Sequence, residues 1–250
     1  MEITRIDEDT GRVDTILPRK NYFLRPAVAN LEVMVIVASG AIPVTDPYLI
    51  DRMTAVAEHK KIRVVIAVNK ADLDPGEELA SLYERVGYPV VRCSAETGEG
   101  IPLLREKIQG KVCAFSGNSG VGKSSILNAL EPGFALQVGE VSQKLGRGRH
   151  TTRHVELFRL SDGTILADTP GFSAFDTDQM DLVSSDQLQL AFPEFAPFIG
   201  HCRFTGCAHG KDKGCAVRKA VNAGQIEKSR YESYLKLYEI AKEQEHEWKK

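Results

Sequence analysis

The segment GNSGVGKSS at residues 117–125 constrains this chain more than any other feature of its 250 residues. It matches the P-loop pattern G-x-x-x-x-G-K-[ST], in which backbone N–H groups surround phosphate oxygens. A β-rich run ends at Ser116 and a helical stretch follows the loop, as the motif requires. We expect Lys123 to neutralise nucleotide phosphates and Ser124 to ligate Mg²⁺. The phosphate-binding residues predicted here are Gly117, Asn118, Ser119, Gly120, Val121, Gly122, Lys123, Ser124 and Ser125.

The sequence NKAD at residues 69–72 predicts which base the nucleotide carries, because it directly follows the apolar run VVIAV. Asp72 can accept hydrogen bonds from the ring N–H and the amine of guanine, and adenine lacks both donors at this position. After the next apolar run, SAE at 94–96 is similar to loops that cap a base with a backbone N–H. GTP or GDP is therefore the expected ligand. The base-binding residues predicted are Asn69, Lys70, Ala71, Asp72, Ser94 and Ala95.

Short apolar runs alternate with amphipathic stretches, which predicts an α/β fold with a mostly parallel sheet and helices on both faces. The expected strands are 33–37, 64–68, 90–93 and 112–116, and the expected helices are 47–60, 77–87 and 101–109. A hairpin is expected over 154–160 and 164–168, another within 1–27, and a charged surface or packing helix over about 225–247.

The segment DTPG at 168–171 resembles the DxxG switch of GTPases. Asp168 would hold Mg²⁺ through water, and the N–H of Gly171 would contact the γ-phosphate. Thr151 or Thr152 would close on Mg²⁺ and the γ-phosphate; spacing does not choose, and we take Thr152 as the working assignment. Phe172 stands where many GTPases place a glutamine that orients the attacking water, so we expect slow intrinsic hydrolysis. His150 is a candidate for that role, beside the alternative of a solvated loop histidine.

Four late residues, Cys202, Cys207, His209 and Cys215, form the pattern C-x₄-C-x-H-x₅-C. Three thiolates and one imidazole suit a closed tetrahedral Zn²⁺ site of the structural type. The segment around them has few apolar residues, so a metal would supply stability that packing does not. His201 is an alternative to His209 as the fourth ligand. Cys93 and Cys113 lie in predicted strands and are expected in the core.

The chain has only five cysteines, three of them clustered late, which argues against a disulfide framework, and no apolar run approaches the length of a membrane span. We therefore expect a cytoplasmic protein without membrane contact, and a monomer. The net charge of −2 gives no general reason for a nucleic-acid partner, but two local clusters of basic residues suggest contacts with a phosphate backbone, beside the alternative of solvated loops rich in Lys and Arg. They contain Arg147, Arg149, His150, Arg153 and His154, and Arg203, Lys211, Lys213, Arg218 and Lys219.

The motifs NKAD, SAE, GNSGVGKSS, GRGRHTTRH and DTPGF, followed by the Cys/His cluster, resemble the ribosome small subunit-dependent GTPase A family (RsgA/YjeQ) over roughly residues 20–245. The resemblance implies a circularly permuted GTPase domain, a C-terminal zinc-binding domain and an N-terminal OB-fold. It further implies action in late maturation of the small (30S) ribosomal subunit, with GTP hydrolysis stimulated by that particle and contacts to its rRNA. A hydrophobic residue in the position of Phe172 is a trait of the family.

We expect three parts: a partial OB-fold β segment at 1–27, the circularly permuted GTPase domain at 28–175, and a zinc-binding helical domain at 176–250. Residues 1–27 supply about two of the five strands of an OB barrel, so the barrel is either truncated or begins before this sequence. Two other functions compete: a P-loop ATPase or kinase, which NKAD disfavours, and a zinc-stabilised RNA-binding module with a structural nucleotide. The motif order also suggests that the switch at 168–175 moves the C-terminal domain.

Overall fold

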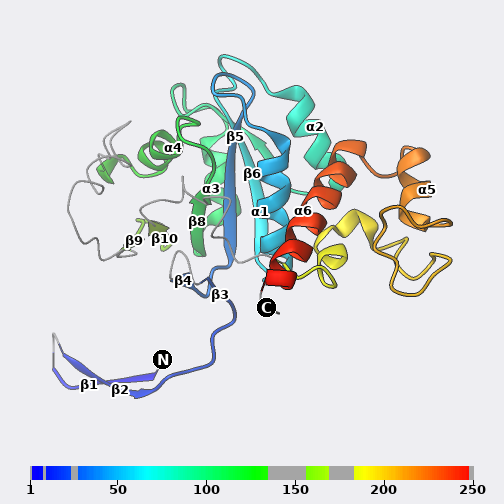
Figure 1. Cartoon of the computed structure of the whole chain (residues 1–250). Helices are drawn as coiled ribbons and strands as arrows, with labels where there is room; N and C mark the ends of the chain where they lie inside the picture. The colour runs from blue at the N-terminus through cyan, green and yellow to red at the C-terminus, as the bar shows by residue number, and fades with distance from the viewer. Residues whose placement is uncertain (1, 8–9, 24–27, 135–155, 169–182, 248–250) are drawn as a thin grey trace.

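In the computed structural model, a six-stranded sheet of order β7-β6-β5-β8-β10-β9 forms the centre of the chain (Figure 1). Its strands are β5 (Val33–Ser39), β6 (Arg63–Asn69), β7 (Val90–Arg92), β8 (Val112–Ser116), β9 (Glu156–Arg159) and β10 (Ile165–Asp168). Neighbouring strands are parallel except β9, which pairs antiparallel with β10 at the edge. The structure describes residues 2–7, 10–23, 28–134, 156–168 and 183–247.

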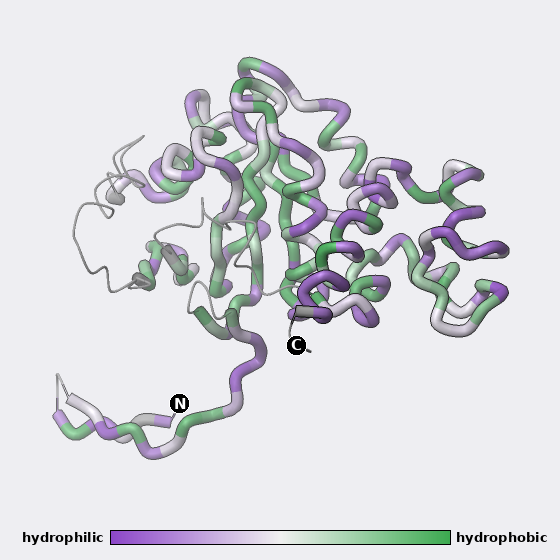
Figure 2. The backbone as a smooth tube through the Cα atoms, viewed as in Figure 1, coloured by the Kyte–Doolittle hydropathy of each residue, from purple (hydrophilic) through white to green (hydrophobic). Residues whose placement is uncertain are grey.

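The central strands are buried because helices cover both faces of the sheet, and every residue of β5 is buried. Alternate side chains of β5 enter two separate cores, since successive residues of a strand point to opposite faces. Met34 and Ile36 join the core shared with α1 (Pro47–His59) and α2 (Glu77–Val86). Val33 and Val35 join the core shared with α3 (Ile101–Ile108) and α4 (Lys123–Leu130). In Figure 2 these strands are mostly green, the colour of hydrophobic residues.

The four strands and three helices predicted from the apolar runs are confirmed, with boundaries that differ by a few residues. The predicted hairpin near 154–168 is confirmed for β9 and β10. Within 1–27, β1 (Glu2–Arg5) and β2 (Gly11–Thr15) form the expected antiparallel hairpin, which stands away from the sheet (Figure 1). A second pair, β3 (Tyr22–Phe23) and β4 (Val28–Ala29), lies at the amino end of β5.

The C-terminal part begins with two short 3₁₀ helices, η4 (Leu188–Ala191) and η5 (Pro193–Phe195), and continues with α5 (Ala216–Asn222) and α6 (Lys228–Glu247). Another 3₁₀ turn, η1 (Pro132–Phe134), follows α4. The charged surface or packing helix predicted over about 225–247 is confirmed as α6, and one side of it is buried, including Tyr234 and Leu237. This side packs against α1 (Figure 1), so the C-terminal part rests on the sheet through α1.

Arg230 of α6 joins these two parts through a buried ion-pair network. Its guanidinium bonds Asp51 of α1 at 2.9 Å and Glu194 of η5 at 2.7 Å. It also donates to Thr54 at 3.1 Å and lies over the ring of Phe192 at 4.6 Å. The side chains of Arg230 and Asp51 are both 0% exposed. Because charges at such depth need partners, this network fixes how α6 sits on α1.

Among the described residues, no helix is long and apolar enough to cross a bilayer.

Candidate nucleotide site and cysteine–histidine cluster

The predicted base and phosphate loops meet at one edge of the sheet. β5, β6, β7 and β8 are parallel, so their carboxyl ends lie at the same edge. The chain moves from β5 outward to β7 and then returns to the other side of β5 to form β8. Ligands of open α/β sheets bind at such a reversal, outside the carboxyl ends of the strands. The NKAD loop, the SAE loop and the P-loop therefore all lie where a ligand is expected.

The P-loop between β8 and α4 depends on two glycines in the left-handed region. Gly117 has φ +142°, and a Cβ there would stand 2.2 Å from the carbonyl oxygen of Val37. Gly122 has φ +94°, and a Cβ there would stand 2.3 Å from Asn69 Nδ2. Only glycine fits either place, because the loop packs directly against β5 and the NKAD segment. Val121 is buried beneath the loop, and its close packing holds the backbone in place.

Lys123 begins α4, and its side chain folds back over the P-loop. Its Nζ donates to the carbonyl oxygens of Gly117 at 2.6 Å and Asn118 at 2.7 Å. Burial lowers the pKa of Lys123 to about 8, because the charged ammonium is partly removed from water. A cation in this state gains most from an anionic ligand, since phosphate oxygens would replace the solvation that it has lost. Ser124 and Ser125, in the same first turn, are half-buried.

Asn69 ties the three loops together. Its Nδ2 donates to the carbonyl oxygen of Val121 in the P-loop at 2.8 Å. Its Oδ1 accepts from the backbone N–H of Ala95 at 3.1 Å. Asn69 is itself 2% exposed. The side-chain amide of Asn69 therefore sets the spacing between the P-loop and the SAE segment. The absence of a Cβ at Gly122 leaves room for this amide.

The other residues of the NKAD segment make contacts separate from the two hydrogen bonds of Asn69. Lys70 adopts φ +64°, and its Nζ donates to the carbonyl oxygen of Ile42 at 2.7 Å. The N–H of Ala71 bonds the Cys93 carbonyl oxygen at 3.1 Å. Asp72 is exposed at the rim, and Ser94 is buried, with its Oγ accepting from Thr97 N at 3.1 Å. Asp72 is thus accessible to a base lying between the loops.

Several predicted residues cannot be placed relative to this edge. His150, Thr151, Thr152, Gly171 and Phe172 lie outside the described residues, and so does the whole of the first basic cluster. Asp168 is the last residue of β10, which pairs with β8. Its backbone therefore ends at the same edge of the sheet as the P-loop strand.

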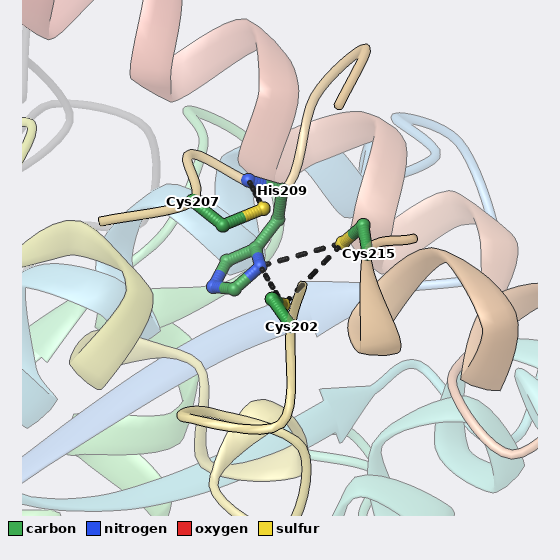
Figure 3. A group of neighbouring side chains, drawn as sticks. All are labelled: Cys202, Cys207, His209 and Cys215. Carbon is green, nitrogen blue, oxygen red and sulfur yellow. Dashed lines mark hydrogen bonds between the residues drawn. The ribbon is translucent and has the colours of Figure 1, made fainter. Parts of the chain in front are cut away.

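The four predicted metal ligands are brought together on the C-terminal part (Figure 3). Their ligand atoms all lie within 4.8 Å of one another. His209 Nδ1 is 3.6 Å from Cys202 Sγ and 3.5 Å from Cys215 Sγ, and the two sulfurs are 3.9 Å apart. A tetrahedral zinc with bonds of about 2.3 Å to sulfur and about 2.0 Å to nitrogen requires about 3.8 Å between sulfurs and about 3.5 Å between sulfur and nitrogen. The cluster has the dimensions of a zinc site, and the exposed His201 is not part of it.

The protonation states and neighbours of these side chains also suit a metal. Burial lowers the pKa of His209, which favours the neutral imidazole that binds metals. Burial raises the pKa of Cys207 to about 12, which favours the protonated thiol. A bound cation would lower this pKa and so deprotonate the thiol. Backbone N–H groups of Ala216 and Arg218 point at the sulfurs of Cys202 and Cys215, at 3.3 and 3.4 Å. The other cysteines, Cys93 and Cys113, are fully buried core residues, as predicted.

Sequence reasoning missed three contributors to these sites. Oε1 of Gln189, in η4, accepts a hydrogen bond from His209 Nε2 at 2.9 Å, and so orients the ring. The carbonyl oxygens of Val37 and Ile42 contact the P-loop and Lys70. Backbone groups carry no sequence signal, and Gln189 stands 13 residues before the first ligand, so no motif could have found them.

A sheet whose guanine-type loops follow β6 and β7, ahead of the P-loop strand β8, defines a circularly permuted P-loop GTPase. The model of the family described as RsgA GTPase matches residues 16–178, and the chain belongs to this family. The predicted ATPase or kinase alternative is thereby excluded.

Individual relatives agree with the family assignment. The chain is 42% identical to a small ribosomal subunit biogenesis GTPase RsgA of Caldanaerobacter subterraneus subsp. tengcongensis, over 98% of this chain and 82% of the relative. It is 45% identical to the protein of the same name from Moorella thermoacetica, over 94% and 81%. Among solved structures, YjeQ from Thermotoga maritima superposes with a TM-score of 0.80 at 34% identity, covering 96% of this chain and 81% of that one. YloQ, titled a circularly permuted GTPase, gives 0.76 at 31%, covering 97% and 79%.

Proposed function

We propose that this GTPase binds GTP between its three loops and uses hydrolysis during maturation of the small ribosomal subunit. The observation that carries the nucleotide assignment is Asn69, whose amide joins the P-loop at Val121 to the base loop at Ala95. The relatives named for small ribosomal subunit biogenesis, at 42% and 45% identity over most of their length, support the ribosomal role.

In this proposal the base is selected by the carboxylate of Asp72 and lies against the Ser94–Ala95 loop. Lys70 and Ala71 hold Asp72 in place through their bonds to Ile42 and Cys93. Residues 117–122 and the start of α4 surround the phosphates, with Lys123 supplying the positive charge. Ser124 would hold Mg²⁺ directly and Asp168 would hold it through water, and the ion would supply positive charge beside the phosphates.

Hydrolysis is assigned to residues around the γ-phosphate. Thr152 closes on the metal and the γ-phosphate, the N–H of Gly171 contacts the same group, and His150 orients the attacking water. Phe172 cannot orient water, so the free protein is a slow enzyme and its partner accelerates it. The small subunit is the proposed accelerator.

The cluster of Cys202, Cys207, His209 and Cys215 holds one structural Zn²⁺. Its four protein ligands leave no position for water, so the ion stabilises the C-terminal domain rather than taking part in hydrolysis. The proposed domains are 1–27, 28–175 and 176–250, in a cytoplasmic monomer. The cations of the second basic cluster, around the Cys/His cluster, contact rRNA phosphates; they include Arg203 and Lys213.

A GTPase assay with purified chain, alone and with small or large ribosomal subunits, tests the proposal. We expect slow release of phosphate from GTP alone, faster release with small subunits, and no response to large subunits. Lys123→Ala is the control for contaminating activity and should lose the signal in every arm. Hydrolysis that ignores small subunits would remove the ribosomal role and leave the GTPase assignment standing.

A further inference from the structure

A surface at the amino end of the sheet, far from the nucleotide edge, combines cations with an exposed aromatic ring. We propose that it binds the rRNA of the small subunit, contacting phosphates with its cations and an unpaired base with Tyr22. This inference rests on the proposed ribosomal role and adds a contact site to it. The surface, called the basal surface below, consists of Arg19, Lys20, Tyr22, Lys60, Lys61 and Arg63.

Two segments far apart in sequence build the basal surface. Residues 19–23 are held on the start of β5 by Asn21, whose side chain bonds both the N–H and the carbonyl of Leu31, at 3.0 and 2.8 Å. Lys20 N also donates to Asn30 Oδ1 at 2.9 Å. The second segment follows α1, and Lys60 Nζ reaches the carbonyl oxygen of Tyr22 at 2.8 Å. The surface is therefore formed before any partner arrives, which lowers the entropic cost of binding.

Tyr22 is 49% exposed and is positioned by cations. Lys60 Nζ lies 5.4 Å from its ring centroid and the Arg19 guanidinium lies 5.9 Å from it. Lys60 also lies 4.9 Å from the centroid of Phe23, which is buried and anchors the segment. Because Arg19 is on an exposed stretch, it can exchange its place over Tyr22 for a phosphate, and a base can stack on the ring that it leaves.

The charge of the basal surface is of one sign. Neither PRKNYF (18–23) nor HKKIRV (59–64) contains an acidic residue. The nearest carboxylates in sequence are Asp14, Glu32 and Glu58, and Asp14 pairs with Arg12 at 2.8 Å. Glu32 pairs with Lys111 at 3.8 Å and accepts from Val112 N at 3.1 Å. Glu58 is half-buried beside the cation of Arg230, and burial raises its pKa. The exposed cations of the basal surface face solvent. Because the net charge of the chain is −2, the positive field that they produce is local to this surface.

This chemistry fits RNA better than a protein partner. Phosphate groups repeat along a strand and match a set of separated cations, whereas a protein partner would need an acidic patch of the same shape. A single exposed tyrosine offers a stacking platform to a splayed base, which occurs in the unpaired segments of folded RNA. We therefore assign the surface to an irregular or single-stranded part of the rRNA.

The test compares binding of full-length variants to purified small subunits, with a non-hydrolysable GTP analogue, at several salt concentrations. Lys61→Glu with Arg63→Glu should weaken binding about tenfold or more and lower the slope of log K against log[salt] by about one to two. The matched control, Lys228→Glu with Lys242→Glu, makes the same change in net charge on exposed positions of α6 and should bind as the unaltered chain does. Tyr22→Leu should weaken binding about fivefold or more, and Tyr22→Phe should not.

Basal GTP hydrolysis without subunits should be the same in all of these variants and reports that they are folded. Normal binding and an unchanged salt slope for Lys61→Glu with Arg63→Glu would overturn the basal-surface inference alone. Equal losses in the α6 control would also overturn it, because total charge would then explain the effect. Absence of binding by the unaltered chain would overturn both this inference and the ribosomal role.

Discussion

Replacing Arg230 with alanine is the sharpest test of how the C-terminal part is attached. The substitution removes the cation that faces Asp51 and Glu194, whose side chains are 0% and 9% exposed. Asp51 would keep only the hydrogen bond from the Tyr83 hydroxyl, at 2.7 Å, among the side-chain contacts described for it. A buried carboxylate without its counter-ion is far more costly than the salt bridge was favourable.

The magnitude follows from that asymmetry. Removing one partner of a buried ion pair costs about 3–5 kcal/mol of unfolding free energy, and here two carboxylates lose the same partner. Loss of the guanidinium from the face of Phe192 adds to this cost, up to about 2 kcal/mol for a desolvated pair. We expect a total of about 4–6 kcal/mol, which is a large part of the roughly 5–15 kcal/mol typical of a folded protein.

Urea unfolding followed by circular dichroism, at saturating Zn²⁺ and GDP, measures the loss. Lys228→Ala is the control, because its side chain is 82% exposed and should cost less than about 0.5 kcal/mol. Arg230→Met combined with Asp51→Asn should be more stable than Arg230→Met alone, since the second change removes one unpaired charge. A loss below about 1 kcal/mol for Arg230→Ala would refute the reasoning, and it would mean that water reaches the network.

Three further predictions concern the two sites. Asp72→Asn should lower GTP affinity about 100-fold and raise affinity for xanthosine triphosphate, because the new amide donates where the carboxylate accepted. Competition binding between the two nucleotides measures this change. An unchanged preference for GTP would contradict the role of Asp72. The pKa of Lys123, lowered to about 8 by burial, implies that its charge is present below pH 8 and lost above it. GDP affinity should therefore fall about tenfold between pH 7 and pH 9, whereas guanosine, which has no phosphates, serves as the control; equal profiles for the two would contradict the assignment. Gln189→Leu should lower zinc affinity about tenfold in a chelator competition, because His209 loses its orienting partner at 2.9 Å, while Gln187→Leu on the exposed side should not.

Much of the fold was predictable because local patterns and tertiary structure agree here. The apolar runs are long enough, and flanked closely enough by turn residues, that VMVIV and VVIAV could only be buried strands. The loops that follow carry motifs with a fixed structural context, so the edge where the nucleotide site lies was implied once the strands were assigned. The Cys/His spacing similarly predicted the cluster that Figure 3 shows.

What could not be predicted depends on contacts between distant segments. Arg230 lies in a helix rich in charged residues, and nothing local separates it from solvated neighbours such as Lys228. Its burial follows only from the approach of Asp51, 179 residues earlier in the chain. The basal surface has the same origin, because Lys60 and Tyr22 are 38 residues apart and neither segment is unusual alone.

The buried network also bears on how a nucleotide signal could reach the C-terminal part. The motif order suggested that a switch at 168–175 moves 176–250 directly, and those switch residues lie outside the described part of the chain. The described part shows α6 and η5 fixed to α1 by Arg230. α1 follows the loop that holds Ile42, whose carbonyl oxygen binds Lys70 of the base loop. Rotation of the C-terminal part on α1 would separate Arg230 from Asp51 and Glu194, so we expect a nucleotide signal to leave that contact intact. We therefore expect the C-terminal part to move together with α1.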